Sequence, residues 1–382
     1  MKIVIVMPAW NEEGNIRRMV DELLSNIFPK IDADMHLLVV GNKSKDKTDE
    51  LATDASKKSD KIHFMQQGAK SGLGWAFIEG YKYAINTLHA DGILEMDADF
   101  QHPPRFIKPM VDAFLAGADY CIGSRYIKGG SVPKEWPLFR KAVSYFGNLF
   151  IRLCLLNFKI HDLTTGFRLT RVEGVLDKID LNNLMEPTRF AHKTDLLYRT
   201  IKLTKKVVEI PLEFAQRTEE QSKFNPKEMI ASFKVAIILG IKDKIKLIKF
   251  GTVGFTGFMV NFILLRVCRN AGLPEVMAWF ISTEVAIINN YIFNNIWTFK
   301  EAKIAGLKNT IIKFGQFNLT SGGALAIQSV FGPLGVKLIG VRYDWLVLAL
   351  VVVFLILPYN YTMYNLVIWK TWKNPFAKKN KA

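Results

Sequence analysis

In the first half of the chain, short apolar runs alternate with polar loops and with segments whose apolar residues have helical spacing. The runs at 2–7 and 35–40 are each followed by such a loop and segment, and a later run at 92–96 ends shortly before Pro103 and Pro104. Consecutive prolines stop a strand and suit the first turn of a helix. Strands that alternate with helices predict a parallel sheet covered by helices. No G-x-G-x-x-G sequence follows the first run, which argues against a nicotinamide-binding site.

The last third of the chain contains long apolar stretches. They cover residues 250–265, 274–299, 314–336 and 345–369. Each is close to the roughly 20 residues that a helix needs to cross a bilayer. We therefore expect an all-α domain with four membrane spans. The preceding segment, 226–248, alternates lysines with apolar clusters, which predicts amphipathic helices lying at the membrane surface.

The lysines around these stretches indicate how the chain crosses the membrane. Four lysines lie between the second and third stretches and five follow the fourth, whereas the other two connections carry two basic residues each. Because cytoplasmic loops carry an excess of Lys and Arg, we expect a multi-pass membrane protein whose termini and amino-terminal domain face the cytoplasm. The run at 2–7 is too short to be the core of a signal peptide.

Composition and charge agree with contact with lipid. Hydrophobic residues make up 49% of the 382 residues, and the net charge is +16. That charge suits a nucleic acid, an anionic membrane surface or an acidic substrate, and the apolar stretches favour the membrane. We expect no nucleic-acid partner, since many cations flank the spans instead of clustering with aromatic residues on the soluble domain. The three cysteines are far apart and lack histidines at ligand spacing, so neither a disulfide nor a zinc site is indicated.

Two carboxylates and an amide follow the apolar run at 92–96. Asp97, Asp99 and Gln101 alternate along the chain at the carboxyl end of this predicted strand. In an open α/β sheet, ligands bind at that edge. Oxygen ligands of this kind suit Mg²⁺ or Mn²⁺ and leave coordination positions for substrate phosphates. Our hypothesis is a metal that holds a nucleoside diphosphate, and the alternative is an acidic turn without a ligand.

Three further segments carry candidate ligands. Lys70 lies beside a glycine-containing loop, where it would either contact a phosphate or be solvated. In the apolar segment that begins at Arg140, a polar residue recurs every fourth position through Ser144 to Arg152, so these residues share one helix face. That helix either lies among lipid headgroups and binds an anionic head, or is a core helix with a solvated stripe. The segment 162–168 either lines a sugar pocket or forms a well-bonded turn.

The order of these motifs resembles that of family 2 glycosyltransferases, and in particular of the dolichol-phosphate mannose synthases. The resemblance covers about residues 1–225, and the combination is more specific than any single motif. The four apolar stretches resemble a GtrA-like membrane domain through the sequence at 290–299, where Asn295 replaces the usual arginine. The motifs that carry the resemblance in the first domain lie at 8–13, 70–74, 97–101, 123–125, 162–168 and 217–223.

The resemblance implies a GT-A (Rossmann-like) catalytic domain at 1–225, amphipathic interface helices at 226–248, and a four-span GtrA-like domain with a basic tail at 249–382. It implies transfer of mannose from GDP-mannose to dolichyl or another polyprenyl phosphate, with inversion, and a divalent cation, Mg²⁺ or Mn²⁺. It assigns Pro8, Trp10 and Glu12 to the nucleotide, Asp97, Ala98, Asp99 and Gln101 to the metal and donor, Arg217 and Lys223 to the donor diphosphate, and Arg125, Arg140 and Ser144 to the acceptor phosphate.

One departure from the family pattern concerns the nucleotide. Where the family usually has Asp-Asp-x-Ser, residues 41–44 are Gly-Asn-Lys-Ser, so Asn42 is the expected substitute for the base or ribose contact. The acceptor phosphate, with a second pKa of about 6, is largely dianionic at neutral pH and needs no general base. Positioning and charge neutralisation should then carry most of the catalysis. Asp162 is the one candidate for an auxiliary base, and its other possible role is to orient the sugar.

Two alternatives stay open. The enzyme could transfer glucose from UDP-glucose to a polyprenyl phosphate instead of mannose. From a different class, the protein could be a flippase for lipid-linked sugars whose cytoplasmic domain only regulates transport, although the metal-ligand pattern argues against this. A processive polysaccharide synthase is disfavoured, because no Gln-x-x-Arg-Trp sequence occurs.

Overall fold

The computed structural model describes residues 1–70, 72–216 and 226–372. The chain divides into two compact units, Met1–Lys242 and Asp243–Ala382, which we describe separately. The first unit has the predicted α/β fold, and its sheet contains seven strands within the described residues, in the order β3-β2-β1-β4-β6-β5-β7. The strands are β1 (Lys2–Ala9), β2 (Asp34–Gly41), β3 (Ile62–Gln66), β4 (Gly92–Glu95), β5 (Tyr120–Ser124), β6 (Arg168–Arg171) and β7 (Val207–Pro211).

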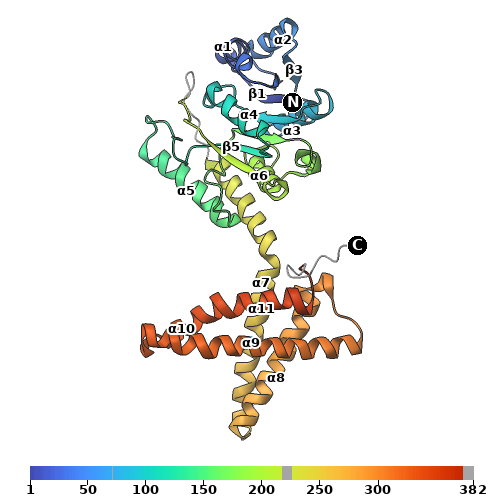
Figure 1. Ribbon diagram of the computed structural model, residues 1–382, viewed down its shortest axis with the longest axis vertical. Coiled ribbons are helices and arrows are strands. Elements are labelled where there is room, and N and C mark those ends of the chain that lie inside the picture. The colour runs from blue at the N-terminus through green and yellow to red at the C-terminus, as the bar shows by residue number, and fades with distance from the viewer. Residues whose placement is uncertain (71, 217–225, 373–382) are drawn as a thin grey trace. The chain divides into compact units, whose positions relative to one another are not determined.

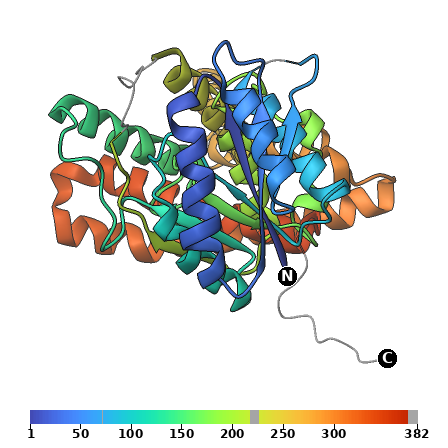
Figure 2. The same ribbon diagram turned by 90° about the horizontal axis from the view of Figure 1, so that it is seen from above.

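Both faces of the sheet are covered by helices, as Figures 1 and 2 show. Successive side chains of a strand point to opposite faces, so the apolar runs fill two cores. Ile3, Ile5 and Met7 pack with helices α1, α2 and α4, whereas Val4 and Val6 pack with α3 and α6. These helices are α1 (Glu13–Glu22), α2 (Thr48–Lys58), α3 (Leu73–Asn86), α4 (Ile107–Leu115) and α6 (His192–Leu203).

The direction of β6 decides which residues meet at the edge of the sheet. Strands β1, β2, β3 and β4 are parallel, but β6 lies antiparallel between β4 and β5. Arg168, the first residue of β6, therefore pairs with Glu95 at the end of β4 and with Ile122 near the end of β5. The segment before β6 and the loops after β4 and β5 consequently share one edge.

Helix α5 (Leu138–Leu155) is not a core helix, so that alternative for the polar stripe is wrong. Of its residues only Asn148 and Ile151 are buried. Large apolar side chains along it are exposed, as expected for a helix that contacts lipid headgroups. They include Leu138, Phe139, Tyr145, Phe146 and Leu153.

The segment 226–248 forms the first part of one continuous helix, α7 (Pro226–Asn270), and not separate amphipathic helices. Four helices of the described chain are long and apolar enough to cross a membrane, as predicted: Lys227–Asn270, Glu275–Thr298, Leu307–Ile339 and Leu346–Ile368. The second of these helices consists of α8 (Glu275–Phe293) and η6 (Asn294–Thr298), and the third is α9 (Leu307–Ile339). The fourth lies within α10 (Asp344–Val351), η9 (Val352–Ile356), α11 (Leu357–Met363) and η10 (Tyr364–Ile368).

An aromatic cluster joins the helices of the second unit. Phe299 stacks on Trp369 with ring centroids 4.4 Å apart, and the ring centroids of Phe317 and Tyr364 are 4.5 Å apart. Asn295, the residue that replaces the usual arginine, accepts hydrogen bonds from the Trp369 indole and from a backbone N–H, at 3.1 and 2.8 Å. Its amide therefore ties the end of the second span to the end of the fourth.

The close contact between α3 and the sheet leads to a stability prediction. A Cβ atom on Gly80 would lie 2.5 Å from Cγ1 of Val6 and 3.1 Å from Cγ2 of Val40. Because overpacking a filled core costs about 1–3 kcal/mol, Gly80→Val should lower the thermal unfolding midpoint by at least about 2 °C. The exposed replacement Asn86→Ala on the same helix is the control and should leave the midpoint unchanged. An unchanged midpoint for Gly80→Val would contradict this packing.

Candidate active site

A cavity of about 740 Å³ opens at the shared edge of the sheet. Loops after β1, β2, β4 and β5 contribute to its wall, together with α5 and the start of α7. Most of the residues that the sequence singled out line it: Pro8, Trp10, Glu12, Asn42, Asp97, Ala98, Asp99, Arg125, Arg140 and Ser144. Gln101 and Lys70 are not among the lining residues, and Arg217 and Lys223 lie outside the described residues.

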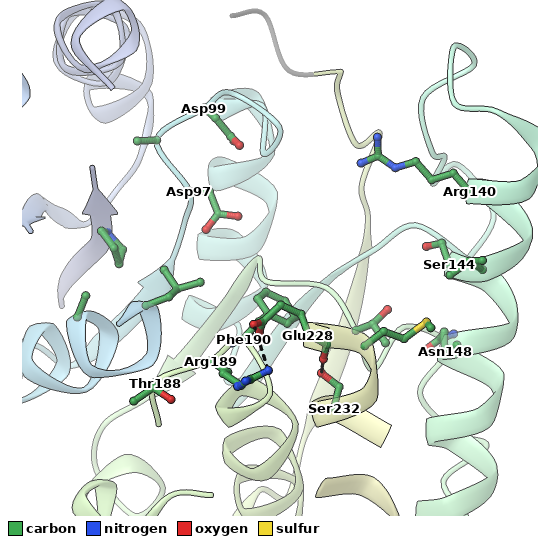
Figure 3. Close-up of a pocket in the computed structure, with 18 of the residues that line it drawn as sticks. Asp97, Asp99, Arg140, Ser144, Asn148, Thr188, Arg189, Phe190, Glu228 and Ser232 are labelled. Atoms are coloured by element: carbon green, nitrogen blue, oxygen red, sulfur yellow. Dashed lines mark hydrogen bonds and ion pairs between the residues drawn. The ribbon is translucent and has the colours of Figure 1, made fainter. Parts of the chain in front are cut away.

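The loop after β4 places two carboxylates at the cavity. The backbone N–H of Asp97 donates to Nδ1 of His102 at 3.2 Å, and that of Gln101 donates to Oδ1 of Asp99 at 3.1 Å. His102 is buried and stacks on Phe167, so it holds the start of the loop. Figure 3 shows Asp97 and Asp99 on this loop, across the cavity from Arg140 and Ser144.

The donor atoms of this loop suit a hard divalent cation. In the described part of the chain, no three His, Cys, Asp or Glu side chains are grouped as a metal site. Two carboxylates in the wall of a cavity are nevertheless the usual protein contribution to a Mg²⁺ or Mn²⁺ ion that is also held by substrate phosphates. Asp97 and Asp99 fit that role, while Gln101 as a third ligand stays a prediction.

One side of the cavity is built from the loops after β1 and β2, which are joined by hydrogen bonds. The backbone N–H of Glu12, after β1, donates to Oγ1 of Thr48 at 2.7 Å. The Asn11 side chain accepts from the backbone N–H of Lys45, after β2, at 2.9 Å. These bonds fix the relative positions of Trp10 and Asn42. Lys70 instead packs its ammonium 3.8 Å from the centroid of the Trp75 ring.

Arg125 is held by a buried ion pair with Asp162. Its Nε and Nη2 donate to the two carboxylate oxygens at 2.8 and 2.9 Å, and Nη2 also donates to Oγ1 of Thr164 at 2.7 Å. The side chain of Arg125 is 8% exposed and that of Asp162 is 0% exposed. The wall of the cavity therefore contains a fixed, oriented guanidinium.

The same contacts exclude Asp162 as a base. Burial alone would raise the pKa of Asp162, but the Arg125 guanidinium and hydrogen bonds from the backbone hold that pKa below its ordinary value. Its oxygens also accept from the backbone N–H groups of Thr164 and Thr165, each at 3.1 Å. The segment 162–168 is thus a well-bonded turn, and Asp162 orients Arg125.

A second arginine is positioned by an aromatic ring. The guanidinium of Arg140 lies 3.8 Å from the centroid of the Trp136 ring. Trp136 is itself buried, with 7% of its surface exposed, and packs edge-on against Phe214. One turn along α5, the Ser144 hydroxyl hydrogen-bonds the Tyr126 hydroxyl at 2.6 Å. The residues of the polar stripe of α5 have different partners. The Asn148 side chain donates to the carbonyl oxygen of His161 and accepts from the backbone N–H of Leu163. Arg140, Ser144 and Asn148 of the stripe line the cavity, and Arg152 is not among its lining residues.

Sequence patterns missed one wall of the cavity. Arg189 lies in the loop before α6, and its Nη1 donates to the backbone carbonyl of Lys227 at 3.3 Å. Glu228, in the first turn of α7, accepts from the backbone N–H of Phe190 at 3.0 Å. Figure 3 shows these residues beside Thr188 and Ser232. They belong to a loop and a helix start that share no motif, so the sequence held no signal for them.

The apolar end of the cavity lies between α5 and α7. Phe150 and Phe233 have ring centroids 4.6 Å apart, and a Cβ atom on Gly147 would lie 3.6 Å from Phe233. We call this end the apolar slot. It is lined by Val143, Gly147, Ile151, Met229 and Phe233.

Comparison with known proteins agrees with this architecture. Residues 4–177 match glycosyl transferase family 2, and residues 249–369 match the GtrA/DPMS transmembrane domain. A dolichol-phosphate mannosyltransferase of Pyrococcus furiosus is 31% identical over 97% of this chain and 100% of its own length. A polyprenol monophosphomannose synthase of Mycolicibacterium smegmatis is 36% identical over 62% of this chain and 86% of its own length.

A third relative, an undecaprenyl-phosphate mannosyltransferase of Micrococcus luteus, is 31% identical over 59% of this chain and 88% of its own length. The first of these relatives matches both units, and the other two match a little under two thirds of the chain. The chain therefore belongs to the dolichol-phosphate mannose synthase family, as a membrane glycosyltransferase with a family 2 catalytic domain followed by a GtrA/DPMS transmembrane domain.

Proposed function

We propose that this enzyme transfers mannose from GDP-mannose to the phosphate of dolichol or another polyprenol. One observation carries the proposal: a single cavity is lined by the two aspartates Asp97 and Asp99 and by three arginines, Arg125, Arg140 and Arg189. The aspartates suit a metal-bound nucleoside diphosphate, and Arg125 with Arg140 suits a second, separate phosphate. The names of the three relatives supply the sugar and the lipid class.

The donor would occupy the side of the cavity formed by the loops after β1, β2 and β4. Trp10 and Asn42 would contact the nucleoside, and Asp97 with Asp99 would hold a divalent cation. When bound, that cation would neutralise the charge of the departing diphosphate. Arg217 and Lys223, outside the described residues, would bind the same diphosphate.

The acceptor phosphate would bind between Arg125, Arg140 and Ser144. Burial alone would lower the pKa of Arg125, but Asp162 holds that pKa above its ordinary value, so the guanidinium stays charged at any working pH. Because the phosphate is already largely dianionic at neutral pH, no residue needs to remove a proton. The fixed guanidinium would align the attacking oxygen, and attack opposite the diphosphate would invert the anomeric centre.

The lipid tail would leave the cavity through the apolar slot. Phe150 packs against Phe233 of the slot, and Phe150 and Phe146 are among the exposed apolar side chains of α5. Those side chains would enter the membrane surface and bring the cavity to the depth of the lipid phosphate. The lysine distribution favours a cytoplasmic location for this unit and for both termini.

The metal ligands provide the first functional test. Replacing Asp99 with Asn should lower kcat/KM for mannosyl transfer by at least about a hundredfold, because the cation that stabilises the leaving diphosphate would be held less tightly. Asp112→Asn, which removes an exposed carboxylate on α4, is the control and should leave the rate unchanged. A flippase would keep moving lipid after the Asp99 replacement. Mannosyl transfer that persists in excess chelator would contradict the metal.

The contact between Arg140 and Trp136 provides a second test. Trp136→Leu keeps the charge of Arg140 but removes the aromatic surface that positions it, so KM for polyprenyl phosphate should rise several-fold while KM for the donor is unchanged. A desolvated cation–π contact contributes about 2 kcal/mol. Lys134→Ala, which removes a nearby exposed charge, should alter neither constant. An equal rise in both constants would contradict an acceptor role for Arg140.

The donor is tested by direct competition. Purified protein with a short polyprenyl phosphate should use labelled GDP-mannose in preference to UDP-glucose, each at the same concentration. Preference for UDP-glucose would replace the mannosyl proposal with the glucosyl one. Asn42→Asp, which restores the carboxylate usual in the family, should change KM for the nucleotide sugar and leave KM for the lipid phosphate unchanged.

A further inference from the structure

One wall of the cavity has no role in the proposed binding of the two phosphates. It contains Arg189, in the loop before α6, and Glu228, in the first turn of α7. Nη1 of Arg189 lies 3.8 Å from Oε1 of Glu228, and the two side chains are 39% and 36% exposed. The pair of Arg125 with Asp162 is buried, whereas this pair presents both of its charged groups at the surface of the cavity.

The backbone that carries this pair is held by contacts within the protein. The carbonyl oxygen of Arg189 accepts a hydrogen bond from Nδ1 of the buried His192 at 2.7 Å. Oε2 of Glu228 accepts from the backbone N–H of Phe190 at 3.0 Å, which joins the loop before α6 to the start of α7. The two charged side chains are therefore placed before a ligand binds.

The pair has hydrogen-bonding capacity that the protein does not use. A guanidinium carries five N–H donors. Within the described residues, the guanidinium of Arg189 donates once, to the carbonyl oxygen of Lys227 at 3.3 Å. Oε1 of Glu228 accepts no hydrogen bond from the described part of the chain. The wall therefore offers several donors beside an acceptor oxygen.

This combination suits a hydroxyl group better than a phosphate. A hydroxyl both donates and accepts, so it can bridge a carboxylate and a guanidinium. A phosphate dianion would be repelled by Glu228, whose carboxylate lies at the surface of the cavity. The carboxylate of Asp162 differs, because it is fully buried and both of its oxygens accept hydrogen bonds from Arg125. Thr188 and Ser232, which also line the cavity, add two hydroxyls beside the pair.

The wall also lies where the proposed function needs a sugar site. A transferred sugar must lie between the diphosphate at the two aspartates and the acceptor phosphate at Arg125 and Arg140. In the view of Figure 3, the pair lies below the aspartates, with α5 across the cavity. The apolar slot, through which the lipid would leave, begins at the next residue of α7, Met229. The pair therefore borders the space that the two phosphates and the lipid leave to the sugar.

We propose that Arg189 and Glu228 bind hydroxyl groups of the transferred hexose and thereby help to select the sugar. The inference rests on the proposed function, because it takes the cavity to hold a sugar nucleotide and a polyprenyl phosphate together. A site that hydrogen-bonds a substrate hydroxyl discriminates against a donor that lacks this hydroxyl, because the polar groups of the site are then left unpaired.

The test compares GDP-mannose with the four analogues that lack its 2-, 3-, 4- or 6-hydroxyl. The full-length protein in detergent transfers each sugar to a short polyprenyl phosphate, and kcat/KM is measured for every donor. The wild-type protein should prefer GDP-mannose over at least one analogue by about tenfold or more, since hydrogen bonds to charged groups are strong. Arg189→Met should reduce that preference to below about threefold, by lowering kcat/KM for GDP-mannose and not for the analogue.

A structural role of Arg189 predicts a different result. It would lower kcat/KM for all donors alike and leave the preference intact, and that result would overturn the inference. Arg189→Met keeps the backbone carbonyl to which His192 donates. If this variant fails to fold, Glu228→Gln replaces it, because its amide oxygen can still accept from the N–H of Phe190. Glu228→Gln should weaken the same preference, and an unchanged preference would count against the pair.

The chain offers a matched control. Arg105 forms an exposed ion pair with Glu213 at 2.6 Å, and neither residue lines the cavity. Arg105→Met therefore removes a guanidinium from an Arg–Glu pair outside the cavity and should leave the preference among donors unchanged. An equal loss of preference in this control would overturn a specific role of Arg189.

The remaining outcomes separate the sugar site from the rest of the proposal. If Arg189→Met raises KM for polyprenyl phosphate and keeps the preference among donors, Arg189 binds the acceptor and the sugar role is overturned. Mannosyl transfer by a wild-type protein that accepts all four analogues equally well would overturn the role of the pair alone. A wild-type protein that transfers no mannose from GDP-mannose would overturn the proposed function, and the role of the pair with it.

Discussion

The active site depends on the antiparallel insertion of β6 between β4 and β5. In a fully parallel sheet, the segment before a strand lies at the opposite edge from the loops that follow its neighbours. Reversing β6 brings the turn that precedes it, with Asp162 and Gly166, to the same edge as Asp97 and Arg125. The buried Arg125–Asp162 ion pair then links that turn to the loop after β5 at 2.8 Å. Without this reversed strand, Asp162 would not lie at the edge where it pairs with Arg125.

In the first unit, the charged side chains of the cavity are held in place by contacts with buried groups. Arg125 is held by the carboxylate of Asp162, and Arg140 lies against the indole ring of Trp136. Both contacts fix the place of a charged group before any substrate binds, so the proposed attack of the acceptor phosphate would need little reorganisation. The proposed mechanism assigns no acid or base to these groups, because the attacking phosphate monoester is already largely dianionic at neutral pH. This agrees with an Asp162 whose oxygens are all used to hold Arg125 and the turn.

The second unit has a different constraint. Within a bilayer, its backbone and polar side chains must form their hydrogen bonds inside the protein, because no water is available. Its aromatic cluster packs residues from each of its four long helices, including Phe250, Tyr291, Phe317 and Trp369. Asn295 supplies both the acceptor for the Trp369 indole and the bonds to the connection at Ile304. The neutral amide of Asn295 thus makes these hydrogen bonds without burying a charge. The arginine that is usual in the family would bring a positive charge to the same position.

The sequence by itself determined that the chain has an α/β domain followed by a helical membrane domain, and it identified part of the active site. Period-two and helical patterns identified the α/β unit and the four apolar helices, because burial against a sheet or in lipid requires those spacings. Asp97, Asp99, Arg125, Arg140 and Ser144 follow local motifs and were identified as cavity residues for that reason. Only the tertiary structure decided the rest. The wall formed by Arg189 and Glu228 joins segments 38 residues apart in its hydrogen bonds, and the ion pair of Arg125 with Asp162 joins residues 37 apart. Nothing in a local pattern records such contacts, since they arise only when strand order and helix packing bring distant side chains together.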